Sequence, residues 1–115
     1  MIGLDPADLD TRITILRAAM VDDGLTRRPG TFAAIGGRWA KKTDVSDGER
    51  QAAAQQGQSI TTRFLMYPDS LTLTITGKDR VGCGQREYSI AGVKERRDLA
   101  GAIEITASDQ PDIAP

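Results

Sequence analysis

The sequence has no histidine, one cysteine and few aromatic side chains, and each shortage weighs against a class of function. Without histidine, the chain lacks the commonest general base, proton shuttle and zinc ligand of proteins. Its single thiol, Cys83, has no histidine to activate it and no partner for an internal disulfide, so a reducing, cytoplasmic site of synthesis is the default. Acids that a fold could bring together, such as Glu87, Glu95 and Glu104, belong to no local motif. We therefore predict a protein that is not an enzyme, with no catalytic residue, no metal and no cofactor.

Long apolar runs and an excess of basic residues are also missing. No run approaches the roughly 20 apolar residues that cross a bilayer, and the N-terminus lacks the basic and then apolar pattern of a signal peptide. The formal net charge is -1, and acids interrupt the basic pairs. A protein that grips DNA through its phosphates usually carries a basic excess. We expect neither a membrane nor tight nucleic-acid binding.

The glycine-rich and acidic motifs match no ligand-binding pattern. The glycines at 36–37 and 82–84 fit neither the phosphate-loop nor the dinucleotide-binding spacing, and we interpret them as turns or bulges. The acids that begin at Asp44 lack the spacing of a calcium-binding loop. They are better explained as turn and cap residues.

The chain does show a period of two. Apolar and polar residues alternate in short runs that turn residues separate, which is typical of β-strands. The expected strands span residues 11–17, 37–43, 60–67, 71–76, 86–93 and 99–106. Trp39, Phe64 and Tyr88 are expected in the core, Leu73 is expected to face it, and Gly92 is expected to form a bulge.

The fold class predicted from these runs is all-β. We expect a small antiparallel β-barrel or sandwich of about six strands, with a hairpin tip at residues 22–24 and an inserted loop with a short helix. Residues 1–106 are expected to form a single domain, and residues 107–115, with two prolines and little to bury, a mobile C-terminal tail.

The segment 46–57 departs from the period of two. Ser46 followed by Glu49 is a capping box, in which the serine cap is worth roughly 1 kcal/mol. Three alanines favour a helix, and Gly57 can end it. Its apolar side chains are methyl groups only, so this helix gains little from packing and is marginal alone. Two interpretations stay open: a helical loop lying on the barrel, or a segment that another protein orders.

The polar side chains of this segment can form hydrogen bonds across an interface. The candidates for a subunit interface or a channel-lining loop are Ser46, Glu49, Arg50, Gln51 and Gln55.

Several motifs follow one another in a recognisable order. They are an R-I-T-I-x-R strand at 12–17, a tryptophan strand at 38–40, Ser-x-x-Glu at 46–49, a threonine strand at 61–64, D-R-V-x-x-G at 79–84, Y-x-I-x-x-V at 88–93, and a basic turn with a last strand at 95–105. In this order, from Leu9 to about Ile105, the chain resembles the head–tail joining proteins of long-tailed phages and gene transfer agents, also called head-closure, stopper or head-tail adaptor-type proteins.

The resemblance implies a non-enzymatic virion part, made in the cytoplasm of the host bacterium and located in the neck. It implies a ring of six or twelve copies below the portal and adaptor, which retains the packaged DNA and gives the tail and its terminator a platform. DNA would pass through the channel without specific binding, which a near-neutral charge suits. Segment 46–57 would be ordered by neighbouring subunits or would gate the channel. The family also has a long hairpin arm, here residues 18–35, which would reach a neighbour or the adaptor or else be a surface hairpin of no special role.

Two alternatives stay open. One is a tail-terminator or another neck component. The other, from a different class, is a small β-barrel module that binds a peptide or nucleic acid through an exposed aromatic cluster or a basic face.

Overall fold

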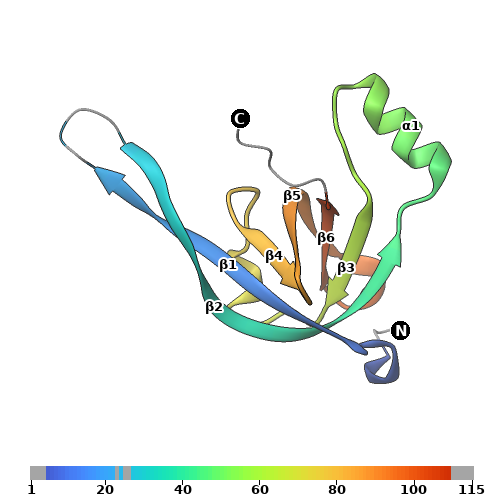
Figure 1. Ribbon diagram of the computed structural model, residues 1–115. Helices are drawn as coiled ribbons and strands as arrows, with labels where there is room; N and C mark the ends of the chain where they lie inside the picture. Colours follow the sequence, from blue (N-terminus) through green and yellow to red (C-terminus); the bar gives the residue numbers. More distant parts are fainter. Residues whose placement is uncertain (1–4, 23, 25–26, 110–115) are drawn as a thin grey trace.

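The alternating runs pair into one closed antiparallel sheet in a computed structural model of the protein (Figure 1). The structure describes residues 5–22, 24 and 27–109. The strands are β1 (Thr11–Asp22), β2 (Arg27–Asp44), β3 (Thr62–Met66), β4 (Arg80–Cys83), β5 (Arg86–Arg96) and β6 (Ala102–Ser108), in the barrel order β1-β2-β3-β6-β5-β4. One α-helix, α1 (Asp47–Gln55), and three 3-10 helices, η1 (Pro6–Asp8), η2 (Thr72–Thr74) and η3 (Arg97–Leu99), lie outside the strands. The prediction of a small all-β barrel with an inserted helix is confirmed.

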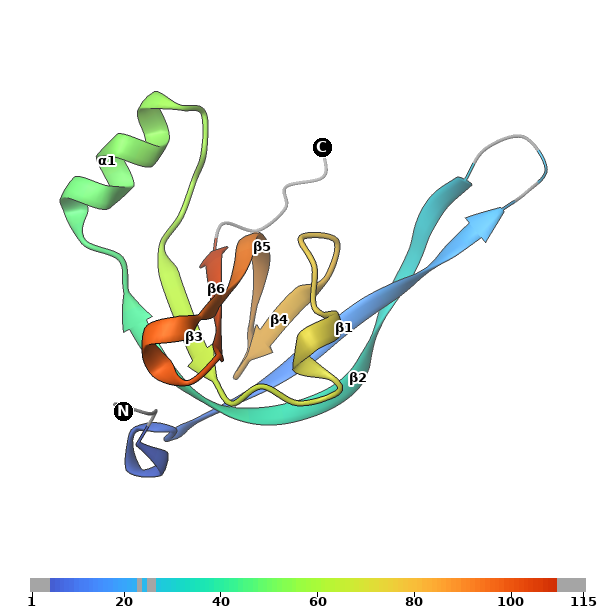
Figure 2. The same cartoon turned by 180° about the vertical axis from the view of Figure 1, so that it is seen from behind.

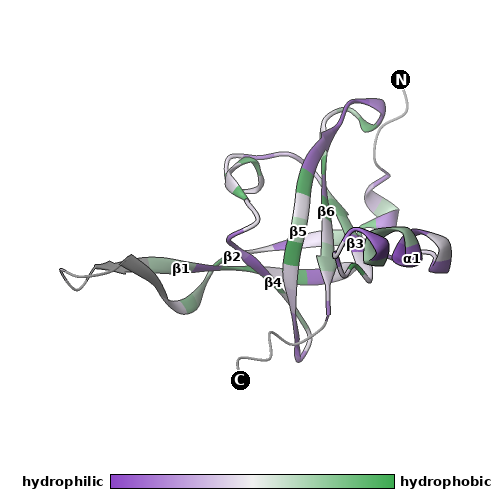
Figure 3. Cartoon of the chain, turned by 90° about the horizontal axis from the view of Figure 1, so that it is seen from above, coloured by the Kyte–Doolittle hydropathy of each residue, from purple (hydrophilic) through white to green (hydrophobic). Residues whose placement is uncertain are grey.

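The inward faces of the strands fill the barrel with apolar side chains. Phe64 and Tyr88 are buried and meet edge to face, with ring centroids 5.1 Å apart. Around this pair lie Ile13, Ile15, Met66, Val81, Ile90, Ile103 and Ile105. Along β5, apolar bands interrupt paler and hydrophilic stretches in Figure 3, and the buried residues of this strand are Tyr88 and Ile90. The core positions predicted for Phe64 and Tyr88 are therefore confirmed.

Glycines mark two of the predicted irregularities. The register of β5 against β6 shifts between Ile90 and Gly92, where a bulge was expected. Gly84 has a φ of 62° in the turn that follows Cys83, a conformation that glycine adopts without strain.

The prediction of a strand over residues 71–76 is wrong, because this segment contains η2. The Asp69 carboxylate accepts hydrogen bonds from the amides of Leu71 and Thr72, both at 2.8 Å. These local bonds satisfy the backbone without a partner strand. Leu73, expected to face the core, is 57% exposed as a result.

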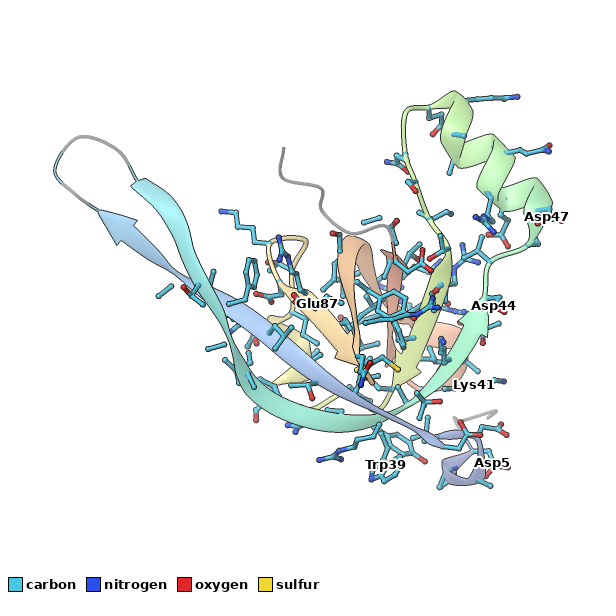
Figure 4. The ribbon with its side chains drawn as sticks, viewed as in Figure 1. Asp5, Trp39, Lys41, Asp44, Asp47 and Glu87 are labelled. Carbon is cyan, nitrogen blue, oxygen red and sulfur yellow. The ribbon has the colours of Figure 1, made fainter. Side chains whose placement is uncertain are left out.

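The prediction for Trp39 is also wrong. This side chain lies on the outside of β2 and is 54% exposed, while the next residue, Ala40, is fully buried. Phe64 and Tyr88 already fill the interior, so the strand turns a methyl group inward and the indole outward. In Figure 4 the labelled Trp39 points away from the barrel.

The last strand ends two residues beyond the predicted 99–106. Ala107 and Ser108, expected in the tail, belong to β6 and are buried, because their small side chains fit the closed wall. The Thr61 amide donates to the Ala107 carbonyl at 2.8 Å. Asp109, the next residue of the predicted tail, donates its amide to Thr61 Oγ1 at 3.0 Å, and residues 110–115 lie outside the described residues.

The first two strands continue beyond the barrel as the predicted hairpin arm. β4 pairs with β1 only over Thr14–Leu16, so the described arm residues beyond Leu16 pair only with the other strand of the arm. The arm projects to one side of the barrel in both Figure 1 and Figure 2, and the molecule measures 51 × 34 × 26 Å. The predicted tip fits the end of β1 at Asp22 and the φ of 89° at Gly24, whereas Asp23 lies outside the described residues.

A bidentate ion pair holds the root of the arm to the barrel. Arg17 Nε and Nη2 donate to the two carboxylate oxygens of Asp79, each at 3.0 Å, and Nη2 also donates to the Thr74 carbonyl at 3.2 Å. Asp79 is only 4% exposed. Burial acts to raise the pKa of Asp79, but the hydrogen bonds from Arg17 and from the Thr76 amide outweigh it and hold the pKa below its ordinary value.

We expect Asp79→Asn to lower the free energy of unfolding at neutral pH by about 2 kcal/mol, less than for a fully buried pair because Arg17 is partly exposed. Because the folded pKa of Asp79 is depressed, this stability is present above the unfolded pKa of about 3.9 and is lost as the pH falls through the folded value. Urea denaturation of both proteins at falling pH measures the difference, which should shrink below about pH 4. A difference independent of pH would contradict this role of the ion pair.

Candidate functional site

The α1 loop, defined here as residues 46–60, joins β2 to β3 and stands off one end of the barrel, as Figure 1 and Figure 2 both show. At its base the Val45 amide donates to the Thr61 carbonyl at 3.0 Å, which prolongs the pairing of the two strands. Ala53 is the one buried residue of the helix, and it forms a small buried cluster with Val45 and Ile60. The helix therefore rests on the two ends of its own loop and leaves the barrel wall uncovered.

The helix is closed at its N-terminus as predicted. The Ser46 hydroxyl oxygen accepts a hydrogen bond from the Glu49 amide at 3.3 Å. The Glu49 carboxylate accepts from Arg63 Nη2 at 2.6 Å instead of returning to the Ser46 amide, because a charge-assisted bond is stronger than one to an amide. This hydrogen bond from Arg63 holds the pKa of Glu49 below its ordinary value.

The C-terminus of the helix is closed by the glycine that the sequence predicts. Gly57 has a φ of 77°. Its amide donates to the Ala54 carbonyl at 3.0 Å, and the Gln58 amide donates to the Ala53 carbonyl at 2.9 Å. This pair of bonds is a Schellman motif, which satisfies the last carbonyls of a helix. Local hydrogen bonds thus define both ends of a helix that has little packing.

The other three candidates face away from these caps. Arg50, Gln51 and Gln55 are exposed, and their side chains form no hydrogen bond or ion pair with any described residue. Arg50 also lines a polar hollow of about 360 Å³ between the base of the loop and the end of the barrel. Asp44 and Asp47, which border the same hollow, are labelled in Figure 4. The five candidates therefore lie on one loop, two in its cap and three on its bare surface.

Sequence reasoning missed the ionic cluster that ties this loop to the barrel wall. Arg63, on β3, lies between Glu49 and Glu104, and its Nε is 3.8 Å from Glu104 Oε1. Glu104 is 8% exposed and accepts from Arg96 Nη1 at 2.5 Å, with Lys94 Nζ at 3.6 Å. The signal in the sequence is opposite charges on strands that turn out to be neighbours. This charge pattern predicts the contact between Arg63 and Glu104 only when the order of the strands in the sheet is known.

We expect Ser46→Ala to weaken α1 by about 1 kcal/mol, because it removes the acceptor of the Glu49 amide. Native-state hydrogen exchange of the helix amides should accelerate about fivefold, while exchange in the barrel stays unchanged. Ser70→Ala, at an exposed position outside the loop, is the matched control. Helix exchange at the wild-type rate would show that the cap does not hold the helix.

A second surface feature is the aromatic patch, defined here as Pro6, Leu9, Trp39 and Tyr67. Together with parts of Arg38, Met66 and Asp69, these residues line a hollow of about 470 Å³. Trp39 is 54% and Tyr67 43% exposed, and the Arg12 guanidinium lies 5.5 Å from the centroid of the Trp39 ring. Exposed tryptophan, tyrosine and arginine together are typical of protein–protein contacts.

Two further observations concern metals and membranes. Within residues 5–22, 24 and 27–109, no three side chains of the types that bind metals come together. No helix in this part of the chain combines the length and the apolar character needed to cross a bilayer.

Comparisons with known proteins identify a family and a solved structure of similar fold. The model of a family described as phage head completion protein matches residues 4–110. The solution structure of protein SF1141 from Shigella flexneri 2a is similar over 95% of this chain and 99% of that chain, with a TM-score of 0.68 and 18% sequence identity. At this identity the likeness concerns the fold alone. No curated protein matches the sequence.

Proposed function

The chain belongs to the phage head completion protein family, whose members are structural proteins of the phage head–tail region, and on this premise we propose that it is the connector of the neck. In this proposal, six or twelve copies form a ring below the portal and adaptor. The ring retains the packaged DNA and gives the tail and its terminator their platform.

The observation that supports this proposal most is the bare surface of the α1 loop. The helix has caps at both ends, one buried alanine and, among its exposed polar side chains, Arg50, Gln51 and Gln55, which bond to no described residue. Such a helix suits a contact that the isolated chain does not supply. Ordered against neighbouring copies, Arg50, Gln51 and Gln55 would supply hydrogen bonds across the subunit interface or line the channel. A preformed helix also lowers the entropic cost of ordering this segment during assembly.

The charge of the loop suits a channel through which DNA slides. Its acids are Asp47 and Glu49, its base is Arg50, and the whole chain has a formal net charge of -1. A surface that held phosphates tightly would hinder passage of the DNA. DNA therefore passes through the ring without specific binding.

The alternative of a small-barrel binding module draws on the aromatic patch, because an exposed aromatic cluster is what such a module requires. A nucleic-acid site would add a basic surface. Here Arg38 Nε donates to Asp69 Oδ2 at 2.8 Å, and the neighbouring η1 has an exposed acid at its N-cap, Asp5, and another at its end, Asp8. The patch therefore suits a protein surface better than a nucleic acid, which makes it a contact within the neck.

Deletion of the gene in the phage or agent that encodes it, followed by negative-stain electron microscopy, tests the proposal. We expect heads that have lost their DNA beside separate, finished tails, and full restoration by the wild-type gene supplied in trans. Tailed, DNA-filled particles from the deletion strain would overturn the connector role.

A further inference from the structure

We infer that Arg63 exchanges between two carboxylates as the α1 loop moves. It binds Glu49 and thereby keeps the loop on the barrel of the free chain, and it binds Glu104 when the loop leaves the barrel. This inference deepens the proposed function and rests on it, because a loop that contacts neighbouring copies has to give up its own contacts first. Arg63 is in this sense a positioning residue of the loop.

The guanidinium of Arg63 is bound unequally by its two acidic neighbours. Its Nη2 donates to Glu49 Oε2 at 2.6 Å. Its Nε is buried, lies 3.8 Å from Glu104 Oε1 and forms no hydrogen bond with any described residue. A buried donor without an acceptor costs free energy. The present position of Arg63 therefore satisfies the carboxylate of the loop but leaves its own Nε–H group without an acceptor.

Glu104 offers the acceptor that this Nε–H group lacks. The residue is only 8% exposed, and its Oε2 accepts from Arg96 Nη1. Its Oε1 has Lys94 Nζ at 3.6 Å and Arg63 Nε at 3.8 Å, both beyond hydrogen-bond distance. Glu104 belongs to β6, which pairs with the β3 strand of Arg63 along its whole length. The second acceptor therefore stays in place when the loop moves.

Another arginine of the same barrel shows the geometry that Arg63 can adopt. Arg17 uses its Nε and Nη2 together to bind both carboxylate oxygens of Asp79, each at 3.0 Å. In Arg63 the same edge of the guanidinium is divided, with Nη2 on the loop and Nε unbonded. When Glu49 withdraws, Nε can close on Glu104, and this new charge-assisted bond offsets part of the lost contact. The two arrangements are then close in free energy, which a two-state element requires.

The loop is able to leave because little else holds it. The helix has nine residues and one buried side chain, Ala53, whose small cluster is separate from the core of the barrel. The Glu49–Arg63 ion pair joins this helix to a strand. A helix of this length is marginal on its own, so detachment of the loop opens its amides to exchange with water.

Hydrogen exchange of the α1 amides in the isolated chain tests the inference, because the two acids should have opposite effects. Glu49→Gln removes the partner of the docked loop, and exchange should accelerate about threefold relative to the barrel amides. Glu104→Gln removes the partner of the released state, and exchange should slow about threefold. A cluster that merely added its ion pairs together would give faster exchange in both variants.

Asp47→Asn is the matched control. It removes a second acid from the first turn of the helix, whereas the described ion pairs of Arg63 are with Glu49 and Glu104. In an Arg63→Gln background, Glu49→Gln should accelerate exchange no more than Asp47→Asn does, and Glu104→Gln should no longer slow it.

Faster or unchanged helix exchange in folded Glu104→Gln would overturn the inference. If that variant does not fold, the NMR signal of the Arg63 Nε–H group in Glu49→Gln decides. This signal should move downfield and exchange with water more slowly than in the wild type, because Nε then donates to Glu104, and an unchanged signal would overturn the inference. These results leave the connector role untouched, since that role fails only if tailed, DNA-filled particles form without the gene.

Discussion

Replacing residues 46–60 by the dipeptide Asn-Gly should leave a folded barrel that no longer joins heads to tails. The Val45–Thr61 hydrogen bond closes the strand pair below the loop, and Asn-Gly suits the two-residue turn that such a hairpin end accepts. The small cluster that is lost packs Ala53 and Ile60 of the loop against Val45 and is separate from the core of the barrel. Thermal melting by circular dichroism measures the fold. Plaque or transduction titre, with the variant as the only copy, measures assembly and should fall to the level of the deletion strain.

A loop of unchanged length provides the control. Arg50→Ser, Gln51→Ser and Gln55→Ser combined keep the caps and the length of the helix but remove the long polar side chains at these three exposed positions. Assembly should fall in this variant too, with the melting temperature almost unchanged, because none of the three is buried. A short-loop protein that supports full titre would contradict the assembly role of the loop. A short-loop protein that does not fold would show that the loop is part of the barrel.

Phe64→Ala should cost about 3–5 kcal/mol of unfolding free energy. The ring of Phe64 is fully buried and meets Tyr88 edge to face, so truncation leaves a cavity that the closed barrel is unable to fill. Total stabilities of small domains are about 5–15 kcal/mol, so this single change removes a large share of the stability of a domain near the lower end of that range. Urea denaturation followed by circular dichroism measures the loss.

Trp39→Ala is the matched contrast, since it removes a larger aromatic side chain from the outer face of the same sheet. We expect a change within about 0.5 kcal/mol, as for other surface positions. Assembly should still suffer, because the patch loses its main side chain. A loss for Trp39→Ala as large as that for Phe64→Ala would mean that the indole is part of the core.

The strands that could be predicted are those in which strict alternation coincides with a partner. Phe64 and Tyr88 are placed correctly because each lies in such a run, and Gly92 because a glycine amid alternation is typical of a bulge. Segment 71–76 alternates equally well, yet the Asp69 carboxylate satisfies its amides locally and no strand forms. Alternation predicts which residues would share a face of a strand. It does not predict whether the backbone amides bond to a neighbouring strand or to a nearby side chain.

Trp39 shows that alternation alone does not predict which face of a strand is buried. Period two assigns a residue to one of two faces, and the choice of the inner face depends on what else the interior holds. A barrel already filled by Phe64 and Tyr88 takes Ala40 inside and leaves the indole outside. The sequence therefore predicts a strand that contains Trp39, but it does not predict the exposed aromatic patch.

Part of the candidate site can likewise be predicted from the sequence, and part of it cannot. Ser46, Glu49 and Gly57 define a helix through bonds over a few residues, and such local chemistry can be read from the sequence. Arg63 and Glu104 lie far apart along the chain and meet only through the register of β3 and β6. Their role in tying the loop to the barrel required the structure.

Cryo-electron microscopy of the neck in intact, DNA-filled particles tests the connector role most directly. The account predicts a ring of this barrel between the adaptor and the tail, with the α1 loop against neighbouring copies or at the channel, and without tight contacts to the DNA phosphates. A neck whose density accommodates no copy of the barrel at the head–tail junction would contradict it.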